Sequence, residues 1–380
     1  MIFELIFLLS FILLVYVYFG YLVILKLFIF CRGKSQNSSS DKAFFPAITV
    51  LITAYNEEKN ILKRIDNILS CQYGNNNIEI IVASDGSTDN TDKIVRNLKE
   101  SKVSLFRPKI RLGKTETQNL AIKKSKGEII IFTDSETHFD KNFITNIVKL
   151  FSSNQVGCAT GRLCFSSNSN AVSESQGFYW SYETQLREIE SSLGILAVTS
   201  GACMAVRKSL FIPIDESYGE DCIVPLDIVI NKHKVIYAKD AIAYDQIDSE
   251  VLAEVFNRSR MTLRNWQGTW SKSCILNPFK FPGYSFALWS HKILRWLSPI
   301  YIFLITISVL ILSYESLVYF YVLQVMLLFY LLGLIGWLAN KSNIKIPIAS
   351  SVFSFLLANL GFLFGLLRVI KKERLKIYRT

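Results

Sequence analysis

Acidic side chains follow three apolar segments of the sequence, each at the point where a buried strand would end. The segments are ITVLITAYNEE from Ile48, IIVASDGSTDNT from Ile80 and EIIIFTDSET from Glu128. Parallel strands buried on both faces read as continuous Val and Ile runs, and ligands of open α/β sheets bind beyond their carboxyl ends. We therefore expect four carboxylates to converge on one crevice, those of Glu57, Asp85, Asp134 and Glu136. Such a crevice requires a cation, and a divalent metal that binds a diphosphate meets that requirement.

The elements that must position these carboxylates alternate along the chain. Strand patterns at 48–53, 78–82, 103–106 and 128–132 alternate with helical patterns at 57–71, at 89–100 and from about Thr115. This rhythm predicts an α/β fold with a Rossmann-like, mostly parallel sheet and right-handed crossovers.

Apolar residues make up 51% of the 380-residue chain and concentrate before Cys31 and after Leu297. The stretch from Leu5 to Leu25 is long enough to cross a bilayer, which takes roughly 20 apolar residues. Basic residues at 26, 32 and 34 follow it directly, so the positive-inside rule places the amino terminus outside and the middle region in the cytoplasm. We expect a transmembrane anchor over 1–31 and a polar tether over 32–45.

The end of the chain is expected to return to the membrane. Residues 279–296 mix aromatics with His291, Lys292 and Arg295, a pattern typical of an interfacial amphipathic helix or of one packed on the soluble domain. About three transmembrane helices are expected over 297–368, before a basic tail at 369–380. Three spans would place this tail outside, whereas its charge places it in the cytoplasm, and the sequence leaves both open.

The net charge of +11 does not indicate nucleic-acid binding, because no recognition-helix or RNA-binding signature accompanies it. Basic residues gather partly beside the membrane segments, where anionic headgroups are their expected counterpart. The seven cysteines stand singly without a C-x-x-C pair, which favours reduced thiols in a cytosolic domain over a disulfide framework or a zinc site.

The motifs of the middle region, taken in order, resemble those of a known family. They are TAYNEE at 53–58, ASDGSTDNT at 83–91, RLGKTETQN at 111–119, DSE at 134–136 and GEDCIVPLD at 219–227. From about Pro46 to Gly268 the chain resembles the family 2 glycosyltransferases, GT-A fold enzymes that include chitin, hyaluronan, cellulose and poly-N-acetylglucosamine synthases. The resemblance implies a cytosolic GT-A domain over 46–278.

The resemblance also implies a nucleotide-sugar site. The first loop would cradle the uridine through Thr53, Ala54, Tyr55 and Glu57, with helix amides near the diphosphate. Asp85 matches the aspartate that binds the base. Lys114 resembles a family lysine near the nucleotide, where its ammonium would act on the diphosphate as a point charge.

Asp134, Ser135 and Glu136 stand where the family has its Asp-x-Asp metal motif. Alternate residues at a strand end can turn two carboxylates toward one ion, so Asp134 and Glu136 are the expected ligands of Mg²⁺ or Mn²⁺. The second aspartate is a glutamate here, which keeps the charge but lengthens the reach. His138 is a further candidate ligand, although a lone histidine is more often structural.

Asp221 matches the family's catalytic aspartate and would be the general base of an inverting transfer. Glu220 and Asp221 could instead simply begin a helix. Upstream, TSGACMAVR from Thr199 resembles the acceptor-side loop, where Gly201 allows close backbone approach. Gly201, Glu220 and Trp266 are therefore expected on the acceptor side, with Trp266 as an aromatic platform or as ordinary packing.

Processive members of the family carry Gln-x-x-Arg-Trp after the base, and this chain has NRSRM at 257–261 in that place. Arg260 keeps the arginine, which could hold the diphosphate, but the glutamine and the tryptophan are missing. Single-sugar transfer is therefore favoured over processive synthesis.

The expected protein is an inverting, metal-dependent hexosyltransferase of the inner (cytoplasmic) membrane, multi-pass and with a cytosolic catalytic domain. Its expected partners are a UDP-linked sugar and a lipid-linked or glycan acceptor, in cell-surface polysaccharide or glycolipid synthesis. A catalytically silent nucleotide-binding scaffold is the alternative of another class. A sugar nucleotidyltransferase is disfavoured, because TAYNEE lacks the glycine-rich loop that would hold a triphosphate.

Overall fold

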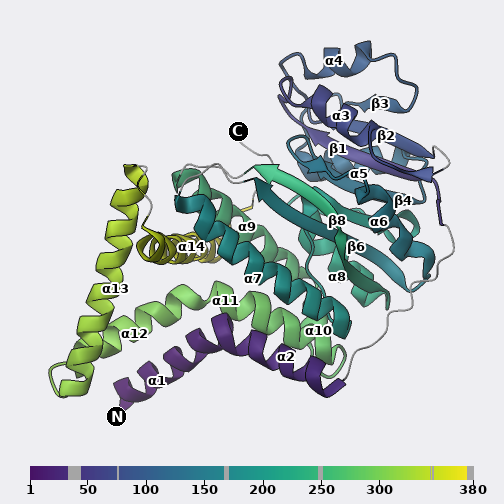
Figure 1. Cartoon of the computed structure of the whole chain (residues 1–380). Helices are drawn as coiled ribbons and strands as arrows, with labels where there is room; N and C mark the ends of the chain where they lie inside the picture. Colours follow the sequence, from purple (N-terminus) through teal and green to yellow (C-terminus); the bar gives the residue numbers. More distant parts are fainter. Residues whose placement is uncertain are drawn as a thin grey trace.

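The computed structural model describes residues 1–32, 44–74, 77–166, 171–246, 251–342, 344 and 346–374. One sheet with the strand order β3-β2-β1-β4-β7-β6-β8-β5 organises the middle of the chain (Figure 1). Its strands are β1 Ile48–Ala54, β2 Ile78–Ser84, β3 Val103–Phe106, β4 Ile129–Asp134, β5 His138–Phe139, β6 Val156–Ser166, β7 Met204–Arg207 and β8 Lys234–Gln246.

The predicted parallel sheet is confirmed for the first half of the domain, where β3, β2, β1 and β4 pair in parallel. The second half is mixed, because β7 runs antiparallel to both β4 and β6 while β6 and β8 are parallel. The GT-A, Rossmann-like character expected from the sequence is thus present, with an irregular extension after β4.

Helices cover both faces of this sheet, as the buried strands require. Side chains of β1 alternate between two cores: Val50 and Ile52 pack in the core with α3 and α6, whereas Leu51 packs in the core with α5 and α8. The helices are α3 Ile61–Leu69, α4 Thr91–Asn97, α5 Lys114–Lys124, α6 Phe143–Val148 and α8 Glu220–Ile230. Two of them begin later than predicted, α3 at residue 61 instead of 57 and α4 at residue 91 instead of 89.

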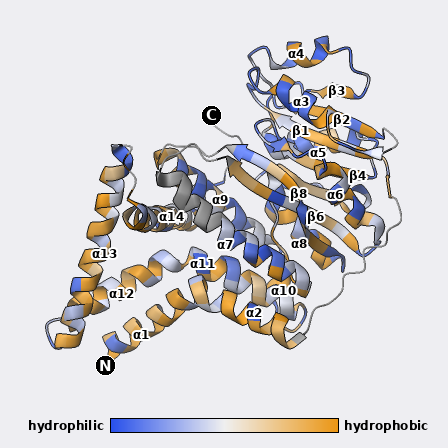
Figure 2. Ribbon diagram, in the orientation of Figure 1, coloured by the Kyte–Doolittle hydropathy of each residue, from blue (hydrophilic) through white to orange (hydrophobic). Residues whose placement is uncertain are grey.

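Among the described residues, three helices are long and apolar enough to cross a membrane: Ile2–Cys31, α13 Leu317–Lys341 and α14 Pro347–Ile370. The first comprises α1 Ile2–Val15, a π-helical segment Tyr16–Gly20 and α2 Tyr21–Arg32. Figure 2 shows the hydrophobic colour along α1, α12 and α13, in contrast to the mixed colours of the sheet domain.

The expected interfacial helix and the expected span that follows it form a single bent pair. Pro282–Trp296, which includes α10 Pro282–Ala287 and α11 Leu294–Trp296, meets α12 Ser298–Leu312 at 54°. The 15 residues of α12 reach about 22 Å at 1.5 Å per residue, less than a bilayer core. The pair together is long enough to cross, so the described part of the chain has two or three candidate crossing segments after residue 281.

A buried ionic network fastens the amino-terminal helix to the rest of the chain. His291 lies 2.7 Å from Glu190 and 3.0 Å from Glu183, and Arg295 donates to Glu183 at 2.9 Å. The Tyr21 hydroxyl of α2 also donates to Glu190, at 2.8 Å. His291 and Arg295 thus lie inside the protein against α7 Ala171–Leu193, which supports the packed alternative for this helix.

Helix α14 lies along α9 Val251–Ser271, and glycines let the two backbones approach (Figure 1). A Cβ atom on Gly361 would lie 2.7 Å from Arg258 Cβ, and one on Gly365 would lie 2.5 Å from Thr262 Cβ. Beyond the helix, Gln267 donates to the carbonyl of Glu373 at 2.6 Å. The end of α14 therefore lies beside the carboxyl-terminal part of α9.

Gly365→Val is expected to destabilise the protein by about 1–3 kcal/mol, because the added side chain overpacks the contact with α9. Thermal unfolding of the detergent-solubilised protein measures this effect. Leu363→Val, on the exposed face of the same helix, is the matched control and should leave the Tm nearly unchanged. Equal Tm values for the two variants would show that α14 does not depend on this close approach.

Candidate active site

The carboxyl ends of β1, β2 and β4 lie side by side at one edge of the sheet. Thr53 is the register partner of Asp134 on β4, and Ala54 is the partner of Ser84 on β2. The loops that follow the three strands therefore share this edge, which is where open α/β sheets bind their ligands.

Backbone amides after β1 are bonded to the loop after β2. The bonds run from Asn56 N to Ser87 Oγ (3.1 Å), from Glu57 N to Thr91 Oγ1 (2.8 Å) and from Glu58 N to Asp89 Oδ2 (3.0 Å). Because these amides have partners and α3 begins only at Ile61, they do not form the helix-terminal cradle that the sequence led us to expect at the diphosphate. They hold the two loops together instead.

Asp85, which follows β2, accepts hydrogen bonds from the segment that leads into α5. Its Oδ1 accepts three hydrogen bonds of 2.9 Å, from the N–H groups of Leu112 and Gly113 and from the Thr117 hydroxyl. Its Oδ2 lies 3.5 Å from Arg111 Nε, and the Arg111 guanidinium stacks 3.6 Å from the centroid of the Tyr55 ring. Asp85 therefore orders the loop before α5, and the base contact that the resemblance implies stays a prediction.

Three carboxylates, Glu57, Asp134 and Glu136, lie near one another at the ends of β1 and β4. Partial burial raises the pKa of Glu57, a hydrogen bond from Asn60 opposes this, and the charges of Glu136 and Asp134 raise the pKa further. Asp134 and Glu136 are both accessible to a ligand. The charges of Asp134 and Glu136 both act on Glu57, and a divalent cation bound at this place would relieve that repulsion.

The described residues include no group of three histidine, cysteine, aspartate or glutamate side chains placed to hold a metal by themselves. Mg²⁺ and similar ions are usually bound by only a few protein ligands, and phosphate oxygens complete the coordination. His138 is exposed, and its Nδ1 lies 3.1 Å from the Glu136 carbonyl, so its described contact is with the backbone.

Lys114 connects the two acidic parts of the site. Its Nζ lies 2.8 Å from Asp134 Oδ1 and 2.8 Å from Glu220 Oε1. Burial opposes the charge of this ammonium, but the two carboxylates outweigh burial and raise the pKa of Lys114. The lysine at the start of α5 thereby brings the end of β4 together with the start of α8.

Glu220 and Asp221 lie in the first turn of α8. Their surroundings shift the pKa values of the two carboxyl groups in opposite directions. Burial opposes ionisation of Glu220, but Lys114 and Arg264 lower its pKa to about 2. Burial and the neighbouring Glu220 charge raise the pKa of Asp221. Of the pair, Glu220 is thus the stronger acid and the Asp221 carboxylate is the stronger base.

Glycines allow backbone to approach these carboxylates closely. A Cβ atom on Gly201 would lie 2.8 Å from Glu220 Oε1, and one on Gly219 would lie 2.4 Å from Asp221 Oδ1. The structure therefore places Gly201 against Glu220, and the acceptor role of both residues stays a prediction. Thr199, in the same loop, donates its hydroxyl to the Asp221 carbonyl at 2.8 Å.

Helix α9 adds two arginines to the site, of which the sequence motifs indicated only one. Burial lowers the pKa of Arg260, and the negative charges of Asp134, Asp221 and Glu220 oppose this shift. Arg264, one turn later, was missed. It is buried and donates to Thr115 Oγ1 at 2.9 Å and to the Tyr218 carbonyl. Its spacing of four residues from Arg260, which places both on one helix face, was the available signal.

Trp266 lies among other tryptophans. Its ring centroid is 6.0 Å from that of Trp270 and 5.9 Å from that of Trp296. The side chain is half-buried and packs against the core that contains α8. Packing therefore accounts for much of this residue, and its acceptor role stays a prediction.

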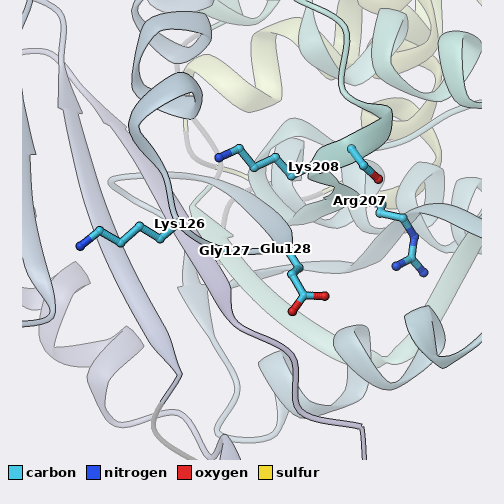
Figure 3. A pocket seen from close by; sticks show the side chains of 6 residues that line it. Lys126, Gly127, Glu128, Arg207 and Lys208 are labelled. Carbon is cyan, nitrogen blue, oxygen red and sulfur yellow. The ribbon is translucent and has the colours of Figure 1, made fainter.

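A hollow of about 510 Å³ lies at the opposite end of the sheet, where β4 begins and β7 ends (Figure 3). Lys126, Glu128 and Arg207 are among its lining residues, and their charged ends point in different directions. The full length of β4 separates this hollow from Asp134, so we do not assign the donor to it.

Comparisons with known proteins agree with this geometry. Residues 49–214 match the family described as Glycosyl transferase family 2. The UDP-Glc:alpha-D-GlcNAc-diphosphoundecaprenol beta-1,3-glucosyltransferase WfaP of Escherichia coli is 31% identical over 109 residues, 29% of this chain and 43% of that protein. The poly-beta-1,6-N-acetyl-D-glucosamine synthase of Staphylococcus epidermidis is 25% identical over 211 residues, 54% of this chain and 50% of that protein. The chain thus spans about half the length of these relatives.

A solved structure shares the fold over nearly the whole chain. The mannosyltransferase PcManGT from Pyrobaculum calidifontis, in complex with GDP-Man and Mn²⁺, superposes with a TM-score of 0.76 at 18% identity and covers 98% of this chain and 100% of that one. Motif order, sheet topology and family match agree: residues 49–214 match the family 2 glycosyltransferases, and the chain has the GT-A fold.

Proposed function

We propose that the protein is an inverting, metal-dependent hexosyltransferase that moves a sugar from a UDP-linked donor to a lipid-linked or polysaccharide acceptor. The observation that carries this proposal is the position of Lys114, 2.8 Å from both Asp134 and Glu220. One ammonium thereby joins the carboxylate expected at the metal and diphosphate to the acidic pair expected at the acceptor. The names of the relatives support the chemistry, since one transfers glucose from UDP-Glc to a lipid-linked acceptor.

Asp221 takes the proton of the acceptor hydroxyl in this proposal. The freed oxygen attacks the anomeric carbon from the face opposite the diphosphate, so the bond to the nucleoside diphosphate breaks and the configuration inverts. The raised pKa of Asp221 suits this role, because a stronger base accepts the proton more readily. Its ionised neighbour Glu220 is held by Lys114 and Arg264 and does not compete for the proton.

The leaving diphosphate needs positive charge. A divalent ion held by Asp134 and Glu136 would, when bound, neutralise charge that develops on the leaving group. Lys114 and the α9 residues Arg260 and Arg264 add cations from the protein itself. The accessible Tyr55 and Arg111 stack beside Asp85 would receive the base.

The acceptor is proposed to reach the site from the membrane. Apolar helix α14 runs along α9, the helix that carries Arg260, Arg264 and Trp266. A membrane-bound acceptor would thus meet the site at a raised effective concentration. The bond from Gln267 to Glu373 keeps the end of α14 beside the catalytic domain, which supports a cytoplasmic position for the basic tail at the inner membrane. Residues 375–380 of that tail lie outside the described part of the chain.

Processive synthesis is a second candidate, favoured by the relatives named poly-beta-1,6-N-acetyl-D-glucosamine synthase. Against it stands the segment NRSRM at 257–261, where only Arg260 keeps the pattern of processive enzymes. The size of the product distinguishes the two, because single transfer adds one sugar per acceptor and processive synthesis yields long chains.

The purified protein, tested with UDP-, GDP- and dTDP-sugars and with Mn²⁺ or Mg²⁺, should release free nucleotide from one UDP-sugar in the presence of a polyprenyl-diphosphate sugar acceptor. Chelation of the metal should abolish this release. Nucleotide binding without turnover of any donor, with lipid or glycan acceptors present, would contradict the proposal and favour a silent scaffold.

A further inference from the structure

Helix α3 carries a charged side chain on its buried face. Ile61, Ile65 and Ile68 face the core at helical spacing, and Arg64 shares their face with no exposed surface. Arginine is almost never fully buried unless it is paired. An explanation is therefore needed for the presence of a cation at this position.

Arg64 contacts the end of β4, its own helix α3 and the strand β5. Its Nη2 donates to Thr133 Oγ1 at 2.8 Å, its Nη1 donates to Asn67 Oδ1, and its guanidinium lies 4.0 Å from the centroid of the Phe139 ring. Within the described chain, no carboxylate forms an ion pair with it, and Nε has no hydrogen-bond partner. The hydrogen bonds of the cation thus go to neutral groups that flank one turn, while the charges of Asp134 and Asp245 act on it from beyond ion-pair distance.

Asn67, one turn later on α3, completes this arrangement from the other side. Its Oδ1 accepts from the Phe139 N–H at 2.8 Å, and its Nδ2 donates to the Phe139 carbonyl at 2.9 Å. Thr133 and Phe139 directly bracket the segment 134–138, which carries the carboxylates expected at the metal. Arg64 and Asn67, one turn apart on α3, therefore bind the residues at both ends of this turn.

Burying a charge is costly, and for Arg64 burial outweighs the favourable charges of Asp134 and Asp245, whereas a methionine could fill a similar space without that cost. The core of α3 therefore does not need a guanidinium for its packing. The planar guanidinium of arginine can donate to Thr133 and Asn67 at the same time, which an apolar side chain cannot do.

We propose that Arg64 and Asn67 are positioning residues that fix the turn bearing Asp134 and Glu136, so that both carboxylates are in place before a divalent cation binds. The inference rests on the proposed function, which supplies the cation. Partners that orient metal ligands without touching the metal typically alter affinity strongly when removed.

The test is a titration of the detergent-solubilised, full-length protein with Mn²⁺ in the presence of UDP, in which free Mn²⁺ is followed by electron paramagnetic resonance. Asn67→Ala and Arg64→Lys are expected to raise the Kd for Mn²⁺ about 10-fold. Arg64→Lys keeps the charge but loses the fork, and it tests the proposal even if Asn67→Ala fails to fold. Asn97→Ala and Arg96→Met, exposed on α4, are matched controls and should leave the Kd unchanged.

A lowered Tm with an unchanged Kd for Mn²⁺ would assign both residues to stability alone and overturn the proposal. The proposal is also overturned if the unaltered protein binds no Mn²⁺. If it binds Mn²⁺ but turns over no donor, the proposed function fails, while the comparison of Kd values still decides the role of Arg64 and Asn67.

Discussion

Asp221→Asn is expected to lower kcat about 10³-fold, because general-base catalysis contributes a factor of this order and the amide cannot accept the proton. The substitution preserves size, and Asp221 keeps its place beside Gly219. Donor binding, measured as the KM or Kd of the UDP-sugar, should change little, since Lys114 contacts Glu220 and Asp134 and not this residue. Nucleotide release with a saturating acceptor measures the effect.

Asp227→Asn provides the control on the same helix. Asp227 is buried, and its carboxylate pairs with Lys272 and has no described contact with Lys114 or Glu220. The substitution should lower stability and leave kcat within a few-fold of the original value. Similar losses of kcat in both variants would remove the assignment of Asp221 as the base.

The pH dependence follows from the same environment. A base whose pKa is raised loses its negative charge at a higher pH than an ordinary aspartate as the solution is acidified. The acid limb of kcat/KM should therefore lie above the usual aspartate range, and it should disappear in the residual activity of Asp221→Asn.

The parallel half of the fold could be predicted because buried strands have a strong local signature. The predicted 48–53 and 78–82 fall inside β1 and β2, and the position of Asp134 opposite Thr53 follows from parallel pairing. Helix beginnings were less predictable. The amides of Asn56 and Glu57 find partners in the loop after β2, a contact between segments about 30 residues apart that no local pattern announces.

Buried charges were the features that sequence patterns could not assign. Lys63 and Arg64 are adjacent basic residues, and only the direction of the core decides that the first is exposed and the second is enclosed. The helical spacing of Arg64 with Ile61 and Ile65 contained that information, but an arginine on an apolar face reads as an interruption of the pattern. Arg264 escaped notice because its partner Thr115 lies 149 residues away.

The role of α14 likewise depends on tertiary structure. Its sequence indicates a membrane span, and its length and composition allow one. Its glycines, however, pack against Arg258 and Thr262 of the helix that carries Arg260 and Arg264, two arginines of the candidate site. The helix is therefore both a membrane candidate and part of the support for the site, which hydropathy alone does not distinguish.

Lys114→Met is expected to lower kcat/KM for the UDP-sugar about 10²-fold, the cost of removing one well-placed electrostatic contact in an active site. It should also destabilise the protein by about 3–5 kcal/mol at pH 7, because Glu220 is then left buried with less compensation. The pKa of Glu220, about 2 with Lys114 present, would rise in the variant. Stability curves in urea and steady-state kinetics measure the two effects separately.

The pH dependence of the stability lost in Lys114→Met distinguishes lost charge compensation of Glu220 from lost packing of the lysine side chain. A carboxylate with a lowered pKa in the folded state stabilises that state above its unfolded pKa, and this contribution is lost as the pH falls toward 2. The difference in stability between Lys114→Met and the original protein should therefore narrow as the solution is acidified and Glu220 becomes protonated in the variant. Adding Glu220→Gln to Lys114→Met should recover stability at pH 7 without recovering kcat/KM. A double variant as unstable as Lys114→Met would mean that the aliphatic chain of Lys114, and not its charge, holds β4 and α8 together.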